Sequence, residues 1–223
     1  MEMFCLECNG CLFPDDLLYA DDAELWFRQD GENYVVGMTS AVLWTAGKNA
    51  RLSLKNKGSF VELGKSLATI ESVKYFGSLR APFDCRIVSV NTSLSPGALT
   101  PSSIYDIGWL VVVSPSVPGD ALLRLVKGAD AHARFEAKIS SLHLNCFAAL
   151  PDADMVEIGT ECNAVLTRLN GEFSGKGAGY VIHLVTDDVT SPIEMIRWSD
   201  ETGNKIIERK KIDNLFHFVL VKS

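Results

Sequence analysis

Short runs of apolar and β-branched residues, many of them alternating with polar residues, dominate the chain from Tyr19 to Pro115. The runs are LWF, YVVGM, ARLSL, SLATI, RIVSV and WLVVV. Turn-forming clusters separate them at residues 30–33, 56–59 and 95–97. Strands that are this short and this closely spaced predict a compact antiparallel sandwich or barrel, so this part of the chain is expected to be mainly β.

Helical signals interrupt the strand pattern at two places. Residues 39–47, TSAVLWTAG, predict a short helix with Thr39 or Ser40 as its N-cap and Gly47 as its stop. After Pro118 the apolar residues recur at helical spacing, with a break near Gly128. We therefore expect two short helices there, covering one face of the sheet.

A second unit is predicted for residues 154–223. MVEI and YVIHLV read as strands, NAVLTRL as a helical turn or two, and KIIERKKI and LFHFVLV as a final pair of strands. Asp213 and Asn214 lie between the last two strands and predict a hairpin. With one more helix before this pair, the order β-α-β-α-β-β predicts a small α+β two-layer sandwich.

That additional helix has a full set of boundary signals. Ser191 is expected to be the N-cap, Pro192 the first helical residue and Glu194 the partner in a capping box. Gly203 is expected to follow the last helical residue.

Composition and charge exclude several classes of protein. The chain has 223 residues, of which 47% are apolar and 22% charged, and a formal net charge of −7. This charge argues against a nucleic-acid or anionic-membrane binder, because both need clustered Lys and Arg. The longest apolar run, Trp109–Val113, is too short to span a bilayer. The first residues, MEMFCLECNGC, lack the features of a secretory signal, so we expect a cytoplasmic protein.

In that compartment the six cysteines are expected to be free, metal-binding or redox-active rather than disulfide-bonded. Cys5, Cys8 and Cys11 have the spacing C-x2-C-x2-C, which can ligate zinc or an iron–sulfur cluster. A closed site needs a fourth ligand, from Cys85, another distant residue or another chain. The alternative is that residues 1–13 form a redox-active or disordered lead-in segment.

Lys74 lies in the stretch TIESVKYFG, and from spacing alone it would be an ordinary solvated charge at a hairpin tip. The surrounding sequence, however, resembles the glycine cleavage system H-protein family over roughly residues 13–139. Its Glu-Ser-x-Lys hairpin is matched by Glu71, Ser72 and Lys74. The glycine about ten residues before the lysine and the proline some eight residues after it are matched by Gly64 and Pro82.

This resemblance implies a lipoyl domain with the barrel-sandwich hybrid fold over residues 14–141, followed by a linker at residues 142–153. It also implies that lipoate is amide-linked to Lys74, with Glu71 and Ser72 recognised by the lipoate-attaching enzyme. The expected role is that of a carrier and not of an enzyme. In the family, the arm shuttles an aminomethyl group from glycine decarboxylase to the aminomethyltransferase and is reoxidised by dihydrolipoyl dehydrogenase.

Two positions depart from the family pattern. The histidine of the family's His-Glu-Trp motif is missing from AELW, residues 23–26. Cys85 replaces a glycine expected after Pro82, and a positive φ at that position would strain the backbone. Neither change removes the lysine itself.

Residues 154–223 resemble the TusA/SirA-like sulfur-carrier family in their Asp-Asp segment, second helix and terminal hairpin. The resemblance implies that Cys162 opens the first helix and carries sulfur as a persulfide. We expect the helix N-terminus to lower the pKa of this thiol. Both prolines of the family's Cys-Pro-x-Pro motif are absent, since residues 163–165 read Asn-Ala-Val.

Three functions therefore remain open from the sequence. The first is an aminomethyl carrier with lipoate on Lys74. The second is a sulfur-trafficking protein in a sulfur-transfer complex, in which lipoyl-Lys74 and Cys162 carry sulfur. The third is a scaffold or regulatory module whose two domains have lost their carrier roles. No catalytic constellation stands out in the sequence, so we expect no independent catalytic centre.

Overall fold

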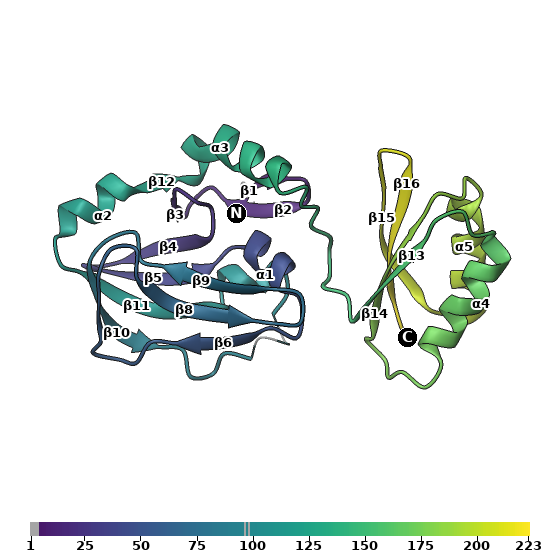
Figure 1. Ribbon diagram of the computed structural model, residues 1–223, viewed down its shortest axis with the longest axis horizontal. Coiled ribbons are helices and arrows are strands. Elements are labelled where there is room, and N and C mark those ends of the chain that lie inside the picture. The colour runs from purple at the N-terminus through teal and green to yellow at the C-terminus, as the bar shows by residue number, and fades with distance from the viewer. Residues whose placement is uncertain (1–4, 96, 98) are drawn as a thin grey trace. The chain divides into compact units, whose positions relative to one another are not determined.

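Two units make up the chain, unit 1 ending at Cys146 and unit 2 beginning at Phe147 (Figure 1). The computed structural model describes residues 5–95, 97 and 99–223. Within these residues no helix combines the length and apolarity needed to cross a bilayer.

A seven-stranded antiparallel sheet forms the larger layer of unit 1, with the strand order β12-β3-β4-β5-β11-β10-β7. Its strands are β3 (Leu18–Ala20), β4 (Leu25–Asp30), β5 (Asn33–Met38), β7 (Phe60–Val61), β10 (Cys85–Val90), β11 (Trp109–Pro115) and β12 (Leu125–Lys127). The predicted antiparallel, mainly β architecture is confirmed for this unit. Cys85 lies inside β10 and is not among the residues with positive φ, so the expected strain is absent.

A three-stranded sheet of β6 (Arg51–Leu54), β8 (Ser66–Glu71) and β9 (Phe76–Arg80) lies over the larger sheet (Figure 1). Phe27 and Tyr34 of the larger sheet pack against Phe83 in the core of unit 1. Trp26 is fully buried, and its indole ring lies against Gly37, where a Cβ atom would overlap the ring. Gly37 therefore lets the largest side chain of this core lie flat on its neighbouring strand.

Helix α1 (Ser40–Ala46) confirms the first helical prediction, with Thr39 as N-cap and Gly47 as C-cap at φ +80°. The Thr39 hydroxyl donates to the carbonyl of Ala23 instead of accepting from the helix. Helices α2 (Pro118–Arg124) and α3 (Gly128–Ser141) confirm the next pair, although strand β12 separates them. A short 3-10 helix, η2 (Ser103–Tyr105), precedes β11.

The N-terminal cysteines lie in a hairpin of β1 (Cys5–Cys8) and β2 (Cys11–Pro14). Asn9 and Gly10 form its two-residue turn, with φ values of +50° and +81°. Asn-Gly is the sequence that such a turn favours, because both residues tolerate positive φ. Residues 5–13 therefore belong to a paired hairpin and not to a disordered segment.

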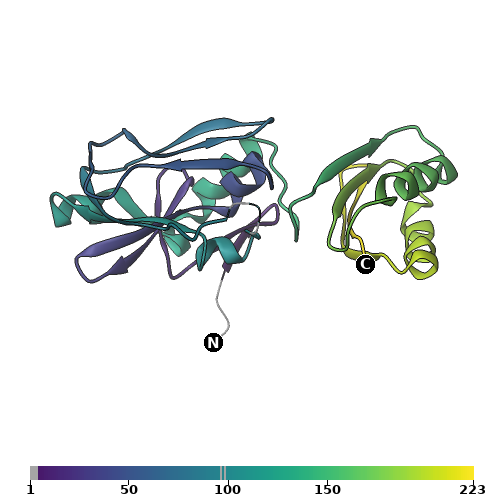
Figure 2. The same cartoon turned by 90° about the horizontal axis from the view of Figure 1, so that it is seen from below.

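Unit 2 contains β13 (Ala153–Glu157), α4 (Cys162–Phe173), β14 (Val181–Thr186), α5 (Ser191–Thr202), β15 (Lys205–Ile212) and β16 (Leu215–Val221). The sheet order is β13-β14-β16-β15, with β13 parallel to β14 and the other pairs antiparallel. Both helices cover one face of this sheet (Figure 2). Between helices and sheet lies an apolar core of Val165, Leu169, Phe173, Ile182, Leu184, Met195, Trp198, Phe218 and Leu220.

The opposite face of this sheet carries two histidines. His183 lies between Ile182 and Leu184 of the helix-facing core, so the two-residue period of a strand places it on the other side. Its Nε2 lies 3.1 Å from Nδ1 of His217, and its Nδ1 lies 3.2 Å from Asp154. The ring of Phe147 packs on both imidazoles and covers them.

Two boundaries in unit 2 test the turn predictions. The hairpin at Asp213 and Asn214 is confirmed, with Asp213 at φ +53°. The predicted N-cap of α5 is wrong by one residue, because Thr190 is the N-cap and Ser191 is already helical. The Thr190 hydroxyl donates to Asp188, and the buried Ser191 hydroxyl has no hydrogen-bond partner.

Candidate functional site

Lys74 lies in the turn that joins β8 to β9. The last paired residues of the two strands are Glu71 and Phe76, so Ser72–Tyr75 form the tip. The Ser72 amide donates to the carbonyl of Tyr75 at 2.7 Å. In the opposite direction, the Ser72 hydroxyl accepts from the amides of Lys74 and Tyr75, at 3.2 and 3.0 Å. One serine thus fixes the backbone on which the lysine is mounted.

Four side chains in and beside this tip are exposed to solvent. Lys74 and Glu71 are exposed, Val73 is fully exposed at 106%, and Phe76 is 75% exposed. The hairpin behind the tip is anchored, since Ile70 and Leu79 are buried in the core of unit 1. An amine on a stiff, protruding turn is accessible to another protein's active site.

The ring of Tyr75 folds back over the hairpin instead of pointing to solvent. A Cβ atom on Gly77 would overlap this ring, so the glycine is required for the ring's position. Tyr75 thereby becomes part of the wall of a pocket of about 220 Å³ next to the lysine turn. The pocket is lined by Asp22, Ala23, Glu24, Ala41, Val42, Thr45, Tyr75, Lys138, Ile139, Leu142 and Leu144.

The pocket beside Lys74 combines apolar walls with one half-buried carboxyl group. Burial raises the pKa of Glu24, and the negative charge of Asp22 raises it further. Lys138 and Arg80 act in the opposite direction on the pKa of Glu24. Burial, and then the charge of Glu24, raise the pKa of the Tyr75 hydroxyl. The site can therefore hold an apolar chain that ends in a hydrogen-bond donor or a cation.

Cys162 is the first residue of α4 and is partly exposed. The expectation of a lowered pKa is wrong, because burial and the charges of Asp188 and Glu194 raise the pKa of this thiol. Only the hydrogen bond with Thr190 lowers it. Hydrogen bonds from the backbone amide and the hydroxyl of Thr190, and then from the backbone amide of Cys162, hold the pKa of the Asp188 carboxyl below its usual value. A carboxylate thus occupies the positive end of α4.

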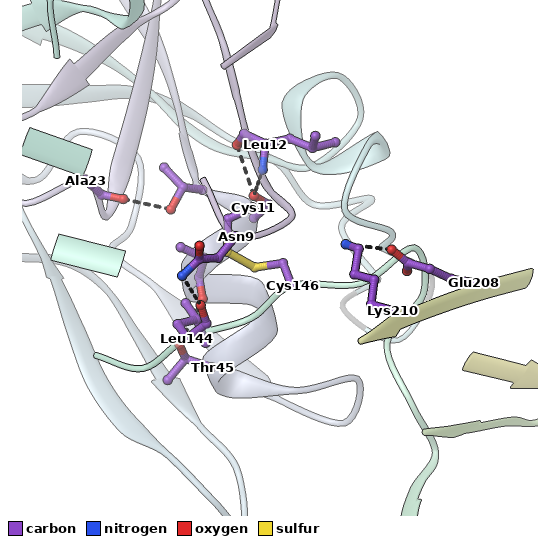
Figure 3. Close-up of a disulfide and its surroundings, with 12 residues drawn as sticks. Asn9, Cys11, Leu12, Ala23, Thr45, Leu144, Cys146, Glu208 and Lys210 are labelled. Carbon is purple, nitrogen blue, oxygen red and sulfur yellow. Dashed lines mark hydrogen bonds and ion pairs between the residues drawn. A yellow bond between two sulfur atoms is a disulfide. The ribbon is translucent and has the colours of Figure 1, made fainter. Parts of the chain in front are cut away.

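The metal hypothesis for the N-terminal cysteines is not supported. Cys11 is bonded to Cys146 in a disulfide, which also contradicts the expectation that the cysteines are not disulfide-bonded (Figure 3). The side chain of Cys5 lies outside the described part of the structure, and Cys8 is buried. Among the residues described, no three His, Cys, Asp or Glu side chains form a metal-binding group.

The sequence alone did not indicate three parts of this site: Glu24, Tyr75 and Gly77. Tyr75 and Gly77 are next to the lysine, but their roles depend on a ring that folds back over the hairpin. Glu24 lies fifty residues before Lys74 and reaches the pocket only through the fold. The Asn9-Gly10 pair was a usable signal for the β1–β2 hairpin.

Comparison with known proteins gives a consistent picture for unit 1. A family model described as glycine cleavage H-protein matches residues 17–138. The chain is 33% identical over 145 residues to glycine cleavage system H protein 5 of Aquifex aeolicus, covering 63% of this chain and 98% of that protein. It is 34% identical over 142 residues to a probable glycine cleavage system H protein 2 of Sulfurisphaera tokodaii, with coverages of 62% and 95%. A solved H protein from Mycobacterium marinum aligns with a TM-score of 0.46 and 26% identity, covering 59% of this chain and all of that chain.

Proposed function

Because the chain belongs to the glycine cleavage H-protein family, whose members are lipoyl carriers, we propose that it carries lipoate on Lys74. The observation that supports this residue is its place at the exposed tip of a hairpin whose backbone is held by Ser72. The side chain of Lys74 ends in the primary amine that an amide linkage needs. Modification removes the charge of the lysine and leaves the residue as a tether.

The bound dithiol group would supply the reversible transfer of an aminomethyl group between glycine decarboxylase and the aminomethyltransferase, with dihydrolipoyl dehydrogenase reoxidising it. The residues of this chain would position the arm. The β8–β9 turn sets the origin of the arm, and the exposed position of Lys74 lets the arm reach partner active sites. Glu71 and Ser72 are proposed as the residues that the lipoate-attaching enzyme recognises.

The pocket beside Tyr75 is proposed as the resting place of the loaded arm. Its apolar walls would exclude water from the arm's end. The carboxylate of Glu24 would accept hydrogen bonds from an ammonium group there, and such charge-assisted bonds are stronger than neutral ones. The positive charge of the cargo would in turn favour the ionised form of Glu24.

Reconstitution tests this function directly. The lipoylated protein is expected to support exchange of bicarbonate carbon with the carboxyl group of glycine when mixed with glycine decarboxylase. The Lys74→Arg variant keeps the positive charge but cannot form the lipoyl amide, so it should give no exchange. Exchange that is equal in the variant, or absent in a wild-type protein shown to be lipoylated, would contradict the aminomethyl role.

A second candidate function concerns sulfur transfer. The observation that favours it is Cys162, which opens α4 with a partly exposed thiol. Its raised pKa is unfavourable, because the thiolate is the form that accepts sulfur. Incubation with a persulfide donor and mass spectrometry tests the idea, with Cys162→Ser as control. Sulfur on Cys162 or on lipoyl-Lys74 would support sulfur transfer, and an unreactive protein would exclude it.

A further inference from the structure

The segment Leu142–Cys146, which follows α3, is held against the β1–β2 hairpin at its end (Figure 3). The amide of Cys146 donates to the carbonyl of Asn9 at 2.9 Å, and the side-chain amide of Asn9 donates to the carbonyl of Leu144 at 3.4 Å. The disulfide between Cys146 and Cys11 is the covalent part of this attachment. These three contacts form a clamp on the end of the segment.

The same segment is a wall of the pocket beside Lys74. Leu142 and Leu144 line that pocket together with Ile139 of α3 and Tyr75 of the lysine turn. Leu142 is 57% exposed, so burial alone does little to hold it. His143, between the two leucines, has a φ of +49°, which is costly for a non-glycine residue. The amides of Leu142, His143 and Leu144 donate to carbonyls of α3, so one end of this wall is attached to the helix and the clamp at Cys146 holds the other end.

We propose that the Cys11–Cys146 disulfide is a reducible clamp that controls whether the pocket beside Lys74 is closed. The clamp itself is a property of unit 1, whereas its effect on a loaded arm rests on the proposed function. In the oxidised form the end of the segment is held, and Leu142 and Leu144 stay in the wall of the pocket. In the reduced form Leu142 and Leu144 move away from the other pocket walls, and the pocket opens to water.

The chemical step is a two-electron thiol–disulfide exchange with a dithiol reductant. One thiolate of the reductant attacks a sulfur of the Cys11–Cys146 bond and forms a mixed disulfide, and its second thiol then displaces the remaining cysteine. The products are two cysteine thiols and one oxidised, cyclic disulfide. Cys11 and Cys146 are 0% and 1% exposed, so the reductant reaches them only after local opening.

Because the reductant reaches the disulfide only after local opening, a substitution that weakens the clamp should speed reduction. The Asn9 side chain makes the weak and exposed contact of the clamp. Asn9→Gly removes that contact and keeps a residue that accepts positive φ in the turn. Reduction by dithiothreitol is therefore expected to be several-fold faster in Asn9→Gly than in the wild type. Equal rates would contradict control of access by this contact.

Hydrogen exchange on the unlipoylated full chain tests the clamp itself. After complete reduction by dithiothreitol, confirmed by a count of thiols, the amides of Leu144 and Cys146 should exchange at least about tenfold faster. Amides of β4 and β5 should stay strongly protected after reduction, which shows that unit 1 remains folded. Cys146→Ser should reproduce the reduced pattern without reductant, and the matched control Cys162→Ser should not.

Two results would overturn the proposal. The first is unchanged exchange at Leu144 and Cys146 after complete reduction. The second is a thiol count showing that Cys11 and Cys146 do not form a disulfide in the oxidised protein. Reoxidation of the reduced wild type should restore the original pattern, so the proposal remains testable if Cys146→Ser fails to fold.

The consequence for the proposed function is measured separately. On lipoylated, aminomethyl-loaded protein, the hydrolytic loss of the cargo should be several-fold faster in Cys146→Ser than in Cys162→Ser. Equal loss with a changed exchange pattern would show that the clamp moves the wall without protecting cargo, which contradicts its control of the pocket. Failure of Lys74 to accept lipoate would refute the proposed function and leave the exchange result as the test of the clamp.

Discussion

The side-chain hydroxyl of Ser72 accepts a hydrogen bond from the backbone amide of Lys74 at 3.2 Å, two residues along the chain. The same oxygen accepts from Tyr75, so it satisfies two donors of a four-residue turn. The backbone of Lys74 is therefore fixed while its side chain is exposed. A carrier lysine needs both properties, because the attaching enzyme must find the amine in a reproducible place.

Ser72→Ala tests the importance of this turn. The substitution removes both hydrogen bonds, and a bond of this kind contributes roughly 1 kcal/mol to local stability. We expect lipoate attachment to Lys74 to slow several-fold, measured as the initial rate of mass gain, while the thermal midpoint changes little. Ser93→Ala, an exposed serine outside the hairpin, is the matched control. Attachment at the wild-type rate in Ser72→Ala would show that the turn does not need the hydroxyl.

Glu24→Gln tests the electrostatics of the pocket. The pKa of Glu24 is raised in the folded protein, so the folded state binds more protons than the unfolded state just above pH 4.5. Stability therefore decreases as the pH rises from 4.5 through the folded-state pKa, and the loss remains at neutral pH. Glu24→Gln should remove this part of the pH dependence and make the unloaded protein more stable at pH 7.

The same variant should have the opposite effect on the cargo. The neutral side-chain amide that Glu24→Gln introduces cannot form an ion pair with an ammonium group, so a loaded aminomethyl group should be lost faster than in the wild type. Denaturant unfolding from pH 4 to pH 8 and a time course of cargo loss measure the two effects. A variant that is less stable at pH 7, or that keeps its cargo as long as the wild type, would contradict this role of Glu24.

His217 is expected to make unit 2 sensitive to acid. Burial, and then the neighbouring His183, lower the pKa of His217. The unfolded state therefore takes up a proton first as the pH falls through 6.5, and unit 2 loses stability toward the lower folded-state pKa. The groups around it are His183, Asp154 on β13, and Glu208 and Lys210 on β15.

Hydrogen exchange of β14 and β16 amides at pH 7.5 and 5.5, corrected for intrinsic rates, measures this acid sensitivity. His217→Gln should reduce the difference between the two pH values, and His143→Asn in unit 1 should leave it unchanged. An acid sensitivity of unit 2 that is the same in His217→Gln would exclude this histidine as its source.

The Cys11–Cys146 disulfide also predicts a stability difference. The two cysteines are 135 residues apart in the chain, so the bond closes a long loop and restricts the unfolded state. In the chain-entropy account a loop of this length contributes about 5 kcal/mol. Thermal unfolding of unit 1 should begin at a lower temperature in Cys146→Ser under oxidising conditions. Wild-type protein with reductant should unfold at the same temperature as the variant. An unchanged thermal midpoint in both would show that the disulfide does not stabilise unit 1.

Local sequence signals predicted local structure well. The signals at Thr39 or Ser40 predicted the start of α1 to within one residue, and Gly47 predicted its end, because capping depends on a few neighbouring residues. The hairpin at Asp213 and Asn214 was predicted for the same reason. The N-cap of α5 was placed one residue late, since Thr190 and not Ser191 engages Asp188.

Features that depend on distant residues were not predictable in this way. Spacing does not reveal which cysteines pair, and Cys146 is 135 residues from Cys11. The pocket is built from four separate parts of unit 1, so Glu24 has no local signal. The pKa of Cys162 was predicted in the wrong direction because the helix end was considered without Asp188 and Glu194. Tertiary contacts outweighed the local rule in each case.

The most direct test of the account is the intact mass of the protein after co-expression with a lipoate-attaching enzyme and supplied lipoate. The account predicts a single lipoyl increment, mapped by peptide analysis to Lys74 and absent from Lys74→Arg. An unmodified chain, in an experiment where a known H-protein becomes lipoylated, would contradict the carrier function. In that case the scaffold hypothesis would replace it.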